Sequence, residues 1–312
     1  MAEKREATSA RVLGGLFLAE LGDKYPNIVT MDCDLPSPLG APFKAKYPGR
    51  AFDAGIAEQN AVGVSAGLAH EGFQPFVLSF TPFLSMRACE QVRTDICYGK
   101  LPVILIGNGA GYSQGICGAT HCGLEDCAIM CSFANMTVLE PSEPWMLPKS
   151  IEAAVELKSP VYIRYSSDAA LPLYEEGYKY QIGRAIIARE GEDAAIIASG
   201  PCVTEAIKAS EALKEESGLT VRVVDMHTLK PLDREAVVNA AMTGKVICVQ
   251  DHTVFGGLGT YVGQIIAESG IGCKYKVLGC PDKFVPLAST RFLYKENEMD
   301  AEGIAKNLKK LT

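Results

Sequence analysis

Short runs of β-branched and other apolar residues alternate with longer amphipathic segments along the whole chain. Short runs that are apolar throughout are typical of strands buried on both faces, and the segments between them have the spacing of helices. This alternation predicts a mainly parallel sheet covered by helices on both faces. In the first part we expect strands at 27–32, 75–80, 102–107, 136–141 and 161–166, and helices at 8–21, 58–70, 82–98, 122–133 and 143–157.

The alternation stops between residues 166 and 183, where Pro, Gly and polar residues are typical of a linker. With 312 residues, two domains are expected. We therefore predict two doubly wound α/β domains, residues 1–176 and a smaller unit at 177–312. In the second unit we expect strands at 194–200, 220–226, 246–250 and 274–280, and helices at 203–216, 233–242, 259–269 and 301–310.

The charge balance favours a small molecule or another protein as the partner. Thirty Lys and Arg stand against 37 Asp and Glu, with no long basic run, so neither nucleic acid nor an anionic membrane is expected as a partner. The uncharged stretch 101–124 contains six Gly and several polar residues, which indicates a buried strand and a loop rather than a membrane span. The first ten residues lack the apolar core of a signal peptide, so we expect a cytoplasmic protein.

Eleven Cys, most of them in apolar runs, are expected to be reduced thiols that pack as small hydrophobes. Four of them have a spacing that resembles a metal or iron–sulfur site, but the paired C-x-x-C of common zinc sites does not occur there. The four cysteines with this spacing are Cys117, Cys122, Cys127 and Cys131. We predict no metal site for this chain.

One catalytic pattern matches a known signature. Residues 111–115 fit G-x-S-x-G, which in α/β-hydrolases exposes a nucleophilic Ser on a sharp turn between a strand and a helix. Here several residues separate Ser113 from its strand, and a loop follows. Because Asp225 or Asp251 with His252 would complete the chain order Ser, Asp, His, a serine hydrolase stays open as an alternative.

A second group of residues accounts for more of the sequence. Glu58 follows a Gly turn at the start of a helix whose remainder is small and apolar, so its carboxyl should be partly buried. The carboxyl then either interacts with the helix dipole or is kept protonatable by its apolar surroundings. Phe80 and Phe83 come at the end of an expected strand, where their rings could stack on a flat heterocycle or pack in the core.

These segments resemble the transketolase family, in particular the C-terminal subunit of transketolases that are split over two chains. The resemblance implies a pyrimidine-binding domain for thiamine diphosphate followed by a transketolase C-terminal domain. It implies transfer of a two-carbon ketol unit from a ketose or ketose phosphate to an aldose. The β subunit of a 2-oxoacid dehydrogenase and other thiamine-diphosphate enzymes share part of the pattern and remain alternatives. The matching segments are ATSARVLGGLFLAEL, FDAGIAEQN, SFTPFLSMRACEQVR, GATHCGLEDCAIMCSFANMTVLEPSEP, SPVYIRY, VVDMHTLKPLDREAV and VQDHTVFGGLG.

The resemblance implies roles at the cofactor. Glu58 matches the glutamate that hydrogen-bonds N1′ of the aminopyrimidine ring, which lets the 4′ nitrogen remove the proton from C2 of the thiazolium. Phe80 and Phe83 match the aromatic pocket around the pyrimidine, and Met86 stands at a third aromatic position. Asp34 matches an acid near the cofactor and the subunit contact.

It also implies roles at the substrate. His121 matches a histidine that contacts the substrate and moves protons, and Arg164 matches an arginine that binds the sugar phosphate. Four positions depart from the family: Ser9 replaces a second phosphate-binding Arg, Gly109 replaces a His, Cys117 replaces an Asp four residues before the histidine, and Cys122 replaces the Gln after it. These departures put a pentose phosphate substrate in doubt and leave a non-catalytic paralogue open as an alternative.

The family holds the diphosphate through Mg²⁺ and a GDG motif, and GDG does not occur in this sequence. The resemblance therefore implies an N-terminal partner subunit that supplies the diphosphate and metal site. It further implies homodimerisation of this chain within an α2β2 assembly, with active sites at the interfaces. The isolated chain is expected to be inactive.

Overall fold

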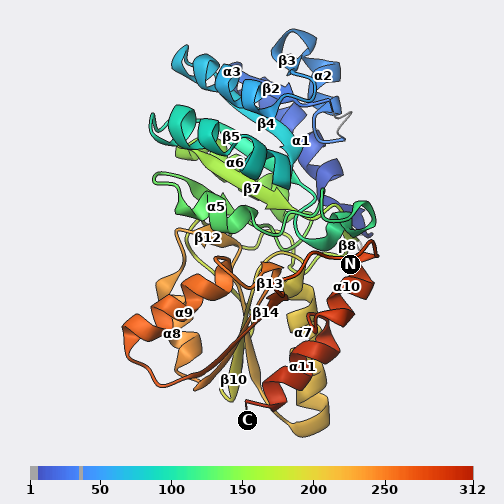
Figure 1. Ribbon diagram of the computed structural model, residues 1–312, viewed down its shortest axis with the longest axis vertical. Helices are drawn as coiled ribbons and strands as arrows, with labels where there is room; N and C mark the ends of the chain where they lie inside the picture. Colours follow the sequence, from blue (N-terminus) through green and yellow to red (C-terminus); the bar gives the residue numbers. More distant parts are fainter. Residues whose placement is uncertain (1–5, 35–37, 312) are drawn as a thin grey trace.

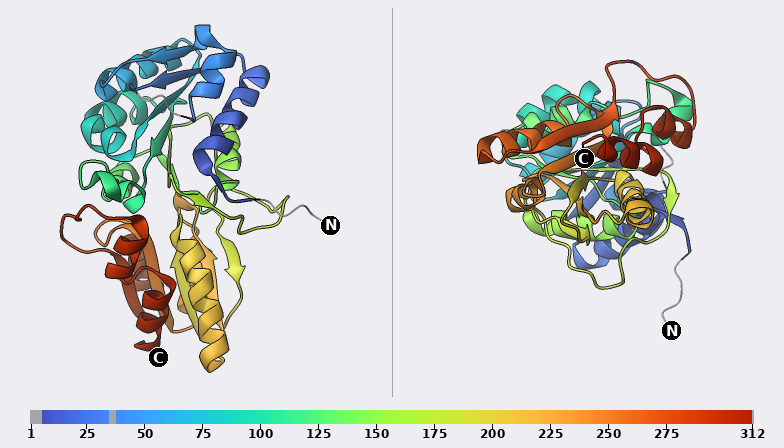
Figure 2. Two further views of the ribbon diagram at one scale, coloured as in Figure 1. Left: turned by 90° about the vertical axis from the view of Figure 1, so that its right-hand side faces the viewer. Right: turned by 90° about the horizontal axis from the view of Figure 1, so that it is seen from below.

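The computed structural model describes residues 6–34 and 38–311 and contains two main sheets, one above the other along the long axis (Figure 1). Helices cover both faces of each sheet, and the side view in Figure 2 shows the two units in contact along one end. Most neighbouring strands run parallel. The structure thus confirms the predicted α/β class with mainly parallel sheets.

The first sheet has seven strands. They are β2 (Ile28–Asp32), β3 (Ala51–Asp53), β4 (Gln74–Phe80), β5 (Ile104–Asn108), β6 (Thr137–Leu139), β7 (Val161–Tyr165) and β12 (Thr228–Lys230). Their order is β12-β6-β7-β5-β4-β2-β3, and only β12 is antiparallel to its neighbour. Because β12 comes from the later part of the chain, the segment after the predicted linker contributes an edge strand to the first sheet.

The helices predicted for this half are present except at 82–98, and one helix, α2, was not predicted. They are α1 (Ala10–Lys24), α2 (Ala41–Lys46), α3 (Glu58–His70), α5 (Asp126–Ser132) and α6 (Met146–Leu157). The expected helix at 82–98 is instead two π-helical turns, η2 (Phe83–Arg87) and η3 (Val92–Cys97), on either side of the short α4 (Cys89–Gln91). In η2 the N–H of Ala88 donates to the carbonyl of Phe83 at 3.2 Å, which is the i→i+5 bond of a π turn.

The second sheet has five strands in the order β14-β13-β10-β11-β9. Four of its helices lie on its two faces, α8 with α9 on one and α7 with α11 on the other (Figure 1). The strands are β9 (Ile186–Arg189), β10 (Ala194–Ala198), β11 (Val221–Asp225), β13 (Lys245–Thr253) and β14 (Lys274–Cys280). The helices are α7 (Cys202–Ser217), α8 (Arg234–Ala241), α9 (Leu258–Ser269), α10 (Thr290–Glu296) and α11 (Ala301–Lys309).

The two halves share a core. One cluster of buried apolar residues extends from Val62 in α3 and Val77 in β4 to Ile197 in β10 and Val262 in α9. The predicted linker contains one short strand, β8 (Ala169–Ala170), which pairs with β1 (Thr8–Ser9). Among the described residues, no helix has both the length and the apolar character needed to cross a bilayer.

Candidate active site

Glu58 is the first residue of α3, and its side chain is only 2% exposed. In the described part of the chain, two groups donate hydrogen bonds to its carboxylate: the Ser79 hydroxyl to Oε1 at 3.0 Å, and Arg87 Nη1 to Oε2 at 2.5 Å. The next turn of α3 brings the buried Ala61 and Val62 into the core beside it. The burial expected from the small, apolar helix is therefore present, and the carboxylate has one neutral and one charged partner.

Phe80 and Phe83 follow at the carboxyl end of β4 and in η2. Their rings meet edge to face, with centroids 5.8 Å apart. The ring of His121 packs edge-on against both, at 5.2 Å from Phe80 and 5.3 Å from Phe83. Phe80 and His121 are 41 positions apart in the sequence but belong to one aromatic group. Phe80 ends β4, and His121 lies in the segment after the adjacent parallel strand β5, at the same edge of the sheet.

Arg87 joins Glu58 to this aromatic group. Its guanidinium carbon lies 4.2 Å from the centre of the Phe83 ring while its Nη1 contacts Glu58. Sequence reasoning missed Arg87, although a cation four residues after an aromatic residue on a helical turn is a detectable signal. Met86 precedes Arg87 in η2 and is 44% exposed, so it lies at the surface of the site.

His121 lies in the loop that follows the short helix η4 (Tyr112–Cys117), and it is half-buried. Its Nδ1 lies 2.9 Å from the Thr120 hydroxyl. Which of the two groups donates depends on the tautomer of the ring. A half-buried imidazole with one ring nitrogen bonded can exchange a proton with a ligand through the other nitrogen.

Asp34 and Cys117 are both exposed. Asp34 has a left-handed backbone, φ 54°, and its N–H donates to Asp53 Oδ1 at 3.0 Å. The thiol of Cys117 lies 3.8 Å from the Gln114 side-chain oxygen. Within the described residues, no hydrogen bond or ring contact joins Asp34 or Cys117 to Glu58 or His121.

Arg164 lies inside β7 and is completely buried. Its Nε lies 2.9 Å from Asp126 Oδ2, and its Nη1 donates to Glu140 Oε1 at 2.6 Å. Its Nη2 donates to the carbonyls of Gly123 at 2.9 Å and Asp251 at 3.0 Å. Both Nη nitrogens donate hydrogen bonds inside the protein, and Nε lies within ion-pair distance of Asp126. This arrangement is incompatible with the expected direct contact between Arg164 and a substrate phosphate.

The residues of the alternative hydrolase triad do not meet. The Ser113 hydroxyl donates to the backbone carbonyl of Ala110 at 2.8 Å. Both carboxylate oxygens of Asp251 accept the N–H of Tyr112, and His252 Nδ1 contacts the carbonyl of Thr253 at 2.8 Å. No hydrogen bond within the described residues joins Ser113 to a histidine. The geometry therefore gives no support to a serine nucleophile.

The four spaced cysteines are not gathered into one site. Cys117 is exposed and the other three are buried, and burial raises the pKa of Cys122 and Cys131 to about 12. Within residues 6–34 and 38–311, Cys127 is the one of these four that belongs to a group of three candidate ligands, together with Asp126 and His252.

That group of three does not suit a metal ion. Asp126 is paired with Arg164 and accepts the Tyr162 hydroxyl at 2.7 Å. His252 Nε2 accepts the N–H of Ala128 at 3.4 Å. Because the buried cation of Arg164 already lies against Asp126, a second cation would be repelled.

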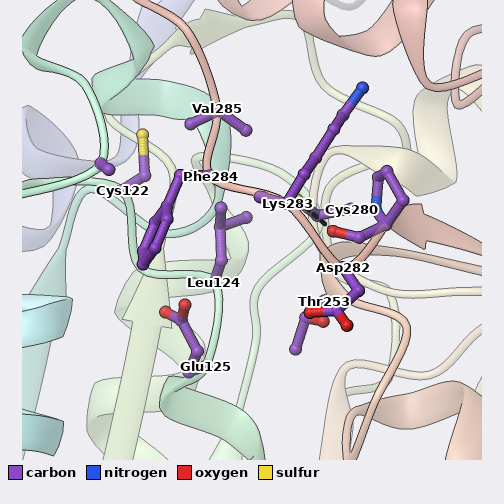
Figure 3. A pocket seen from close by; sticks show the side chains of 11 residues that line it. Cys122, Leu124, Glu125, Thr253, Cys280, Asp282, Lys283, Phe284 and Val285 are labelled. Atoms are coloured by element: carbon purple, nitrogen blue, oxygen red, sulfur yellow. Dashed lines mark hydrogen bonds between the residues drawn. The ribbon is translucent and has the colours of Figure 1, made fainter.

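A cavity of about 240 Å³ lies beside the His121 loop, where the two halves meet. Figure 3 shows Phe284, from the segment after β14, beside Cys122 and Leu124, and all three residues line the cavity. The later part of the chain thus forms one wall next to the loop that carries His121.

The geometry around Glu58 suits a flat, nitrogen-containing ring. A buried carboxyl can bind a ring nitrogen, and the neighbouring Phe83 can stack on the ring face. The aminopyrimidine of thiamine diphosphate has both features, so Glu58, Phe80 and Phe83 are the residues that would hold that half of the cofactor. The donors described here include no cluster of free carboxylates that suits Mg²⁺.

Two family models match the chain: "Transketolase, pyrimidine binding domain" over residues 7–170 and "Transketolase, C-terminal domain" over residues 183–304. A Methanocaldococcus jannaschii protein, named provisionally as a transketolase C-terminal section, is 39% identical over 94% of this chain and 93% of its own length. A 6-deoxy-6-sulfo-D-fructose transketolase subunit of Clostridium sp. is 35% identical over 95% of this chain and 92% of its own length. A solved structure titled "Split gene transketolase, inactive beta4 tetramer" is 35% identical, with a TM-score of 0.89, over 97% of this chain and 98% of that one.

Proposed function

Because this chain belongs to the transketolase family and spans its pyrimidine-binding and C-terminal domains, we propose that it is the C-terminal (β) subunit of a thiamine-diphosphate-dependent transketolase. The observation that supports this most strongly is the buried carboxylate of Glu58 beside the rings of Phe80 and Phe83. The absence of the GDG motif of the metal and diphosphate site from this sequence supports a chain that binds only the ring of the cofactor.

In this proposal Glu58 binds N1′ of the aminopyrimidine and shares a proton with it. Thiamine diphosphate supplies the carbanion chemistry that cleaves and forms the carbon–carbon bond. Phe83 packs on the ring and Phe80 holds Phe83 and His121 in place. Met86 and Asp34 border the cofactor from the exposed side. Burial of Glu58 excludes water from the shared proton.

His121 is proposed to contact the substrate and to move a proton during ketol transfer, with the exposed Cys117 nearby in the sequence. The substrate class is a small ketose, phosphorylated or otherwise anionic, and an aldose acceptor. The named activity of the Clostridium relative, on 6-deoxy-6-sulfo-D-fructose, supports an anionic ketose. Because Arg164 is enclosed, any anionic group has to be held by other residues of the assembly.

We propose an N-terminal subunit as the partner, which binds the diphosphate and Mg²⁺, in an α2β2 assembly. Two observations support a two-chain enzyme. This chain covers nearly the full length of relatives named as subunits or sections. One solved relative is described as an inactive tetramer of β chains, which agrees with a β chain that needs a partner.

The test is ketol transfer after this chain is mixed with a GDG-containing transketolase subunit, thiamine diphosphate and Mg²⁺. Glu58→Gln keeps the shape of the side chain and removes the acid, so the rate should fall by about 10²-fold or more. Glu71→Gln is the matched control, because Glu71 is exposed at the end of the same helix, and it should retain the wild-type rate. Equal rates for Glu58→Gln and wild type would contradict the proposed role, and absence of transfer in the wild-type mixture would favour a non-catalytic paralogue.

A further inference from the structure

Arg87 makes two contacts that no role proposed so far explains. Its guanidinium stacks on Phe83, 4.2 Å from the ring centre, and donates to the Glu58 carboxylate at 2.5 Å. Among the described residues it makes no other hydrogen bond or ion pair. Both of its partners are residues that would hold the aminopyrimidine ring.

A guanidinium is flat and positively charged and carries N–H donors in its plane. A flat group that lies against Phe83 and donates to Glu58 makes the same two contacts as an aminopyrimidine with a proton at N1′. Arg87 and the ring would compete for this position, because both would contact the Phe83 ring and the Glu58 carboxylate, whose Oε2 is held by Arg87 and whose Oε1 is held by Ser79. We propose that Arg87 occupies the aminopyrimidine position in the chain without cofactor and must leave Glu58 before the ring binds. This inference rests on the proposed thiamine-diphosphate function.

The side chain of Arg87 has room to leave. It is 41% exposed, whereas that of Glu58 is 2% exposed, so the cation can swing into solvent while the carboxylate stays in place. The backbone need not follow, since the π turn η2 fixes the Cα of Arg87 one turn after Phe83. π turns of this kind are frequent at functional sites.

The exchange also explains why a buried carboxylate is tolerated before the cofactor binds. An ionised carboxylate with a single hydroxyl partner would be costly in the interior. Arg87 supplies the missing charge, and the ring nitrogen supplies a replacement when it enters. Arg87 is thus a positioning residue for Glu58 and, at the same time, a competitor of the cofactor.

Competition by Arg87 predicts the direction in which the affinity for the cofactor changes. A site that is free only in a fraction of molecules binds its ligand more weakly by that fraction. The ion pair with Glu58 and the stacking on Phe83 are both partly exposed to solvent. Together they should weaken cofactor binding by about three- to thirtyfold. Removing the guanidinium should therefore tighten cofactor binding. If Arg87 instead contacted the bound cofactor, its removal would weaken binding.

The experiment measures the dissociation constant of thiamine diphosphate by titration calorimetry. The sample is the assembly of this chain with its N-terminal subunit in the presence of Mg²⁺. Arg87→Gln and Arg87→Met should each bind the cofactor about three- to thirtyfold more tightly than wild type. Arg93→Gln is the matched control, because Arg93 is exposed in the next π turn, and its affinity should equal that of wild type. Thermal melting of each variant verifies that it is folded.

Unchanged or weaker binding by both Arg87 variants would overturn the inference and leave the proposed function intact. Failure of the wild-type assembly to bind thiamine diphosphate would overturn the proposed function and this inference with it. A measurement that needs no variant is the structure of the wild-type assembly with and without cofactor. The contact of 2.5 Å between Arg87 and Glu58 should be lost on binding, and its persistence beside a bound ring would contradict the competition.

Discussion

Arg164 provides a test of how the site is supported, through the change Arg164→Gln. Its guanidinium stands between two buried acids, Asp126 and Glu140, and also bonds two backbone carbonyls, one of them Asp251 on β13. Removing the charge leaves both acids without a cation in the interior. Such a loss costs about 3–5 kcal/mol of the free energy of unfolding.

Two further variants sharpen this prediction. Arg164→Lys keeps the charge but cannot reach both acids and both carbonyls at once, so we expect a smaller loss of about 1–3 kcal/mol. Arg184→Gln is the control, because Arg184 is 59% exposed and pairs with the exposed Glu235. That change should alter the free energy of unfolding by less than about 1 kcal/mol.

The assay is equilibrium unfolding in urea, followed by far-UV circular dichroism and by the fluorescence of Trp145, the single tryptophan. The midpoint should fall in the order Arg184→Gln, Arg164→Lys, Arg164→Gln. A residue that served only to bind a substrate phosphate would behave differently. If Arg164→Gln kept the wild-type midpoint and raised only the KM for an anionic ketose, the account of Arg164 as an internal brace would be refuted.

Three more predictions concern the conformation, the pH response and the thiols of the isolated chain. Gly111→Ala should lower the free energy of unfolding by about 2–4 kcal/mol, because Gly111 has φ 60° and a Cβ there would lie 2.0 Å from Asp251 Cγ. Gly244 also has a positive φ but has open space around it. The control Gly244→Ala should therefore lower the free energy of unfolding by only about 1 kcal/mol. Burial lowers the pKa of His227 from 6.5 to about 4, so the unfolded chain takes up this proton first and stability falls as the pH drops below about 6.5. Between about pH 7 and about pH 5, the free energy of unfolding of His227→Gln should fall by about 2 kcal/mol less than that of wild type, as measured by unfolding at each pH. An equal fall in the two proteins would contradict the burial of a neutral ring. Brief alkylation followed by mass spectrometry should modify the exposed Cys117 before the buried Cys122 and Cys131; prior modification of either buried thiol would show that this region opens.

The sequence was sufficient to predict the fold class, because buried parallel strands and amphipathic helices have distinct patterns. Most predicted strands and helices lie where they were expected. The exception at 82–98 is instructive, since two π turns replace one helix there. A π turn has almost the same apolar spacing as an α-helix, so hydrophobic periodicity does not distinguish them. The edge strand β12 has only three residues and was missed for that reason.

The candidate site was predicted only in part. The burial of Glu58 followed from the small residues of its own helix, and the grouping of Phe80, Phe83 and His121 agrees with strand order. Arg164 was assigned to the wrong environment, because two acids distant in sequence, Asp126 and Glu140, enclose it. A motif read along one strand does not show what the neighbouring elements place against it.

The most direct test of the central claim is the structure of the two-chain assembly with thiamine diphosphate bound. The measured quantity is the distance between the Glu58 carboxylate and N1′ of the aminopyrimidine. We predict a hydrogen bond of about 2.6–3.0 Å, with the ring against Phe83 and the diphosphate held by the other subunit. A ring bound elsewhere, or a Glu58 side chain turned into solvent while the cofactor is present, would contradict the account.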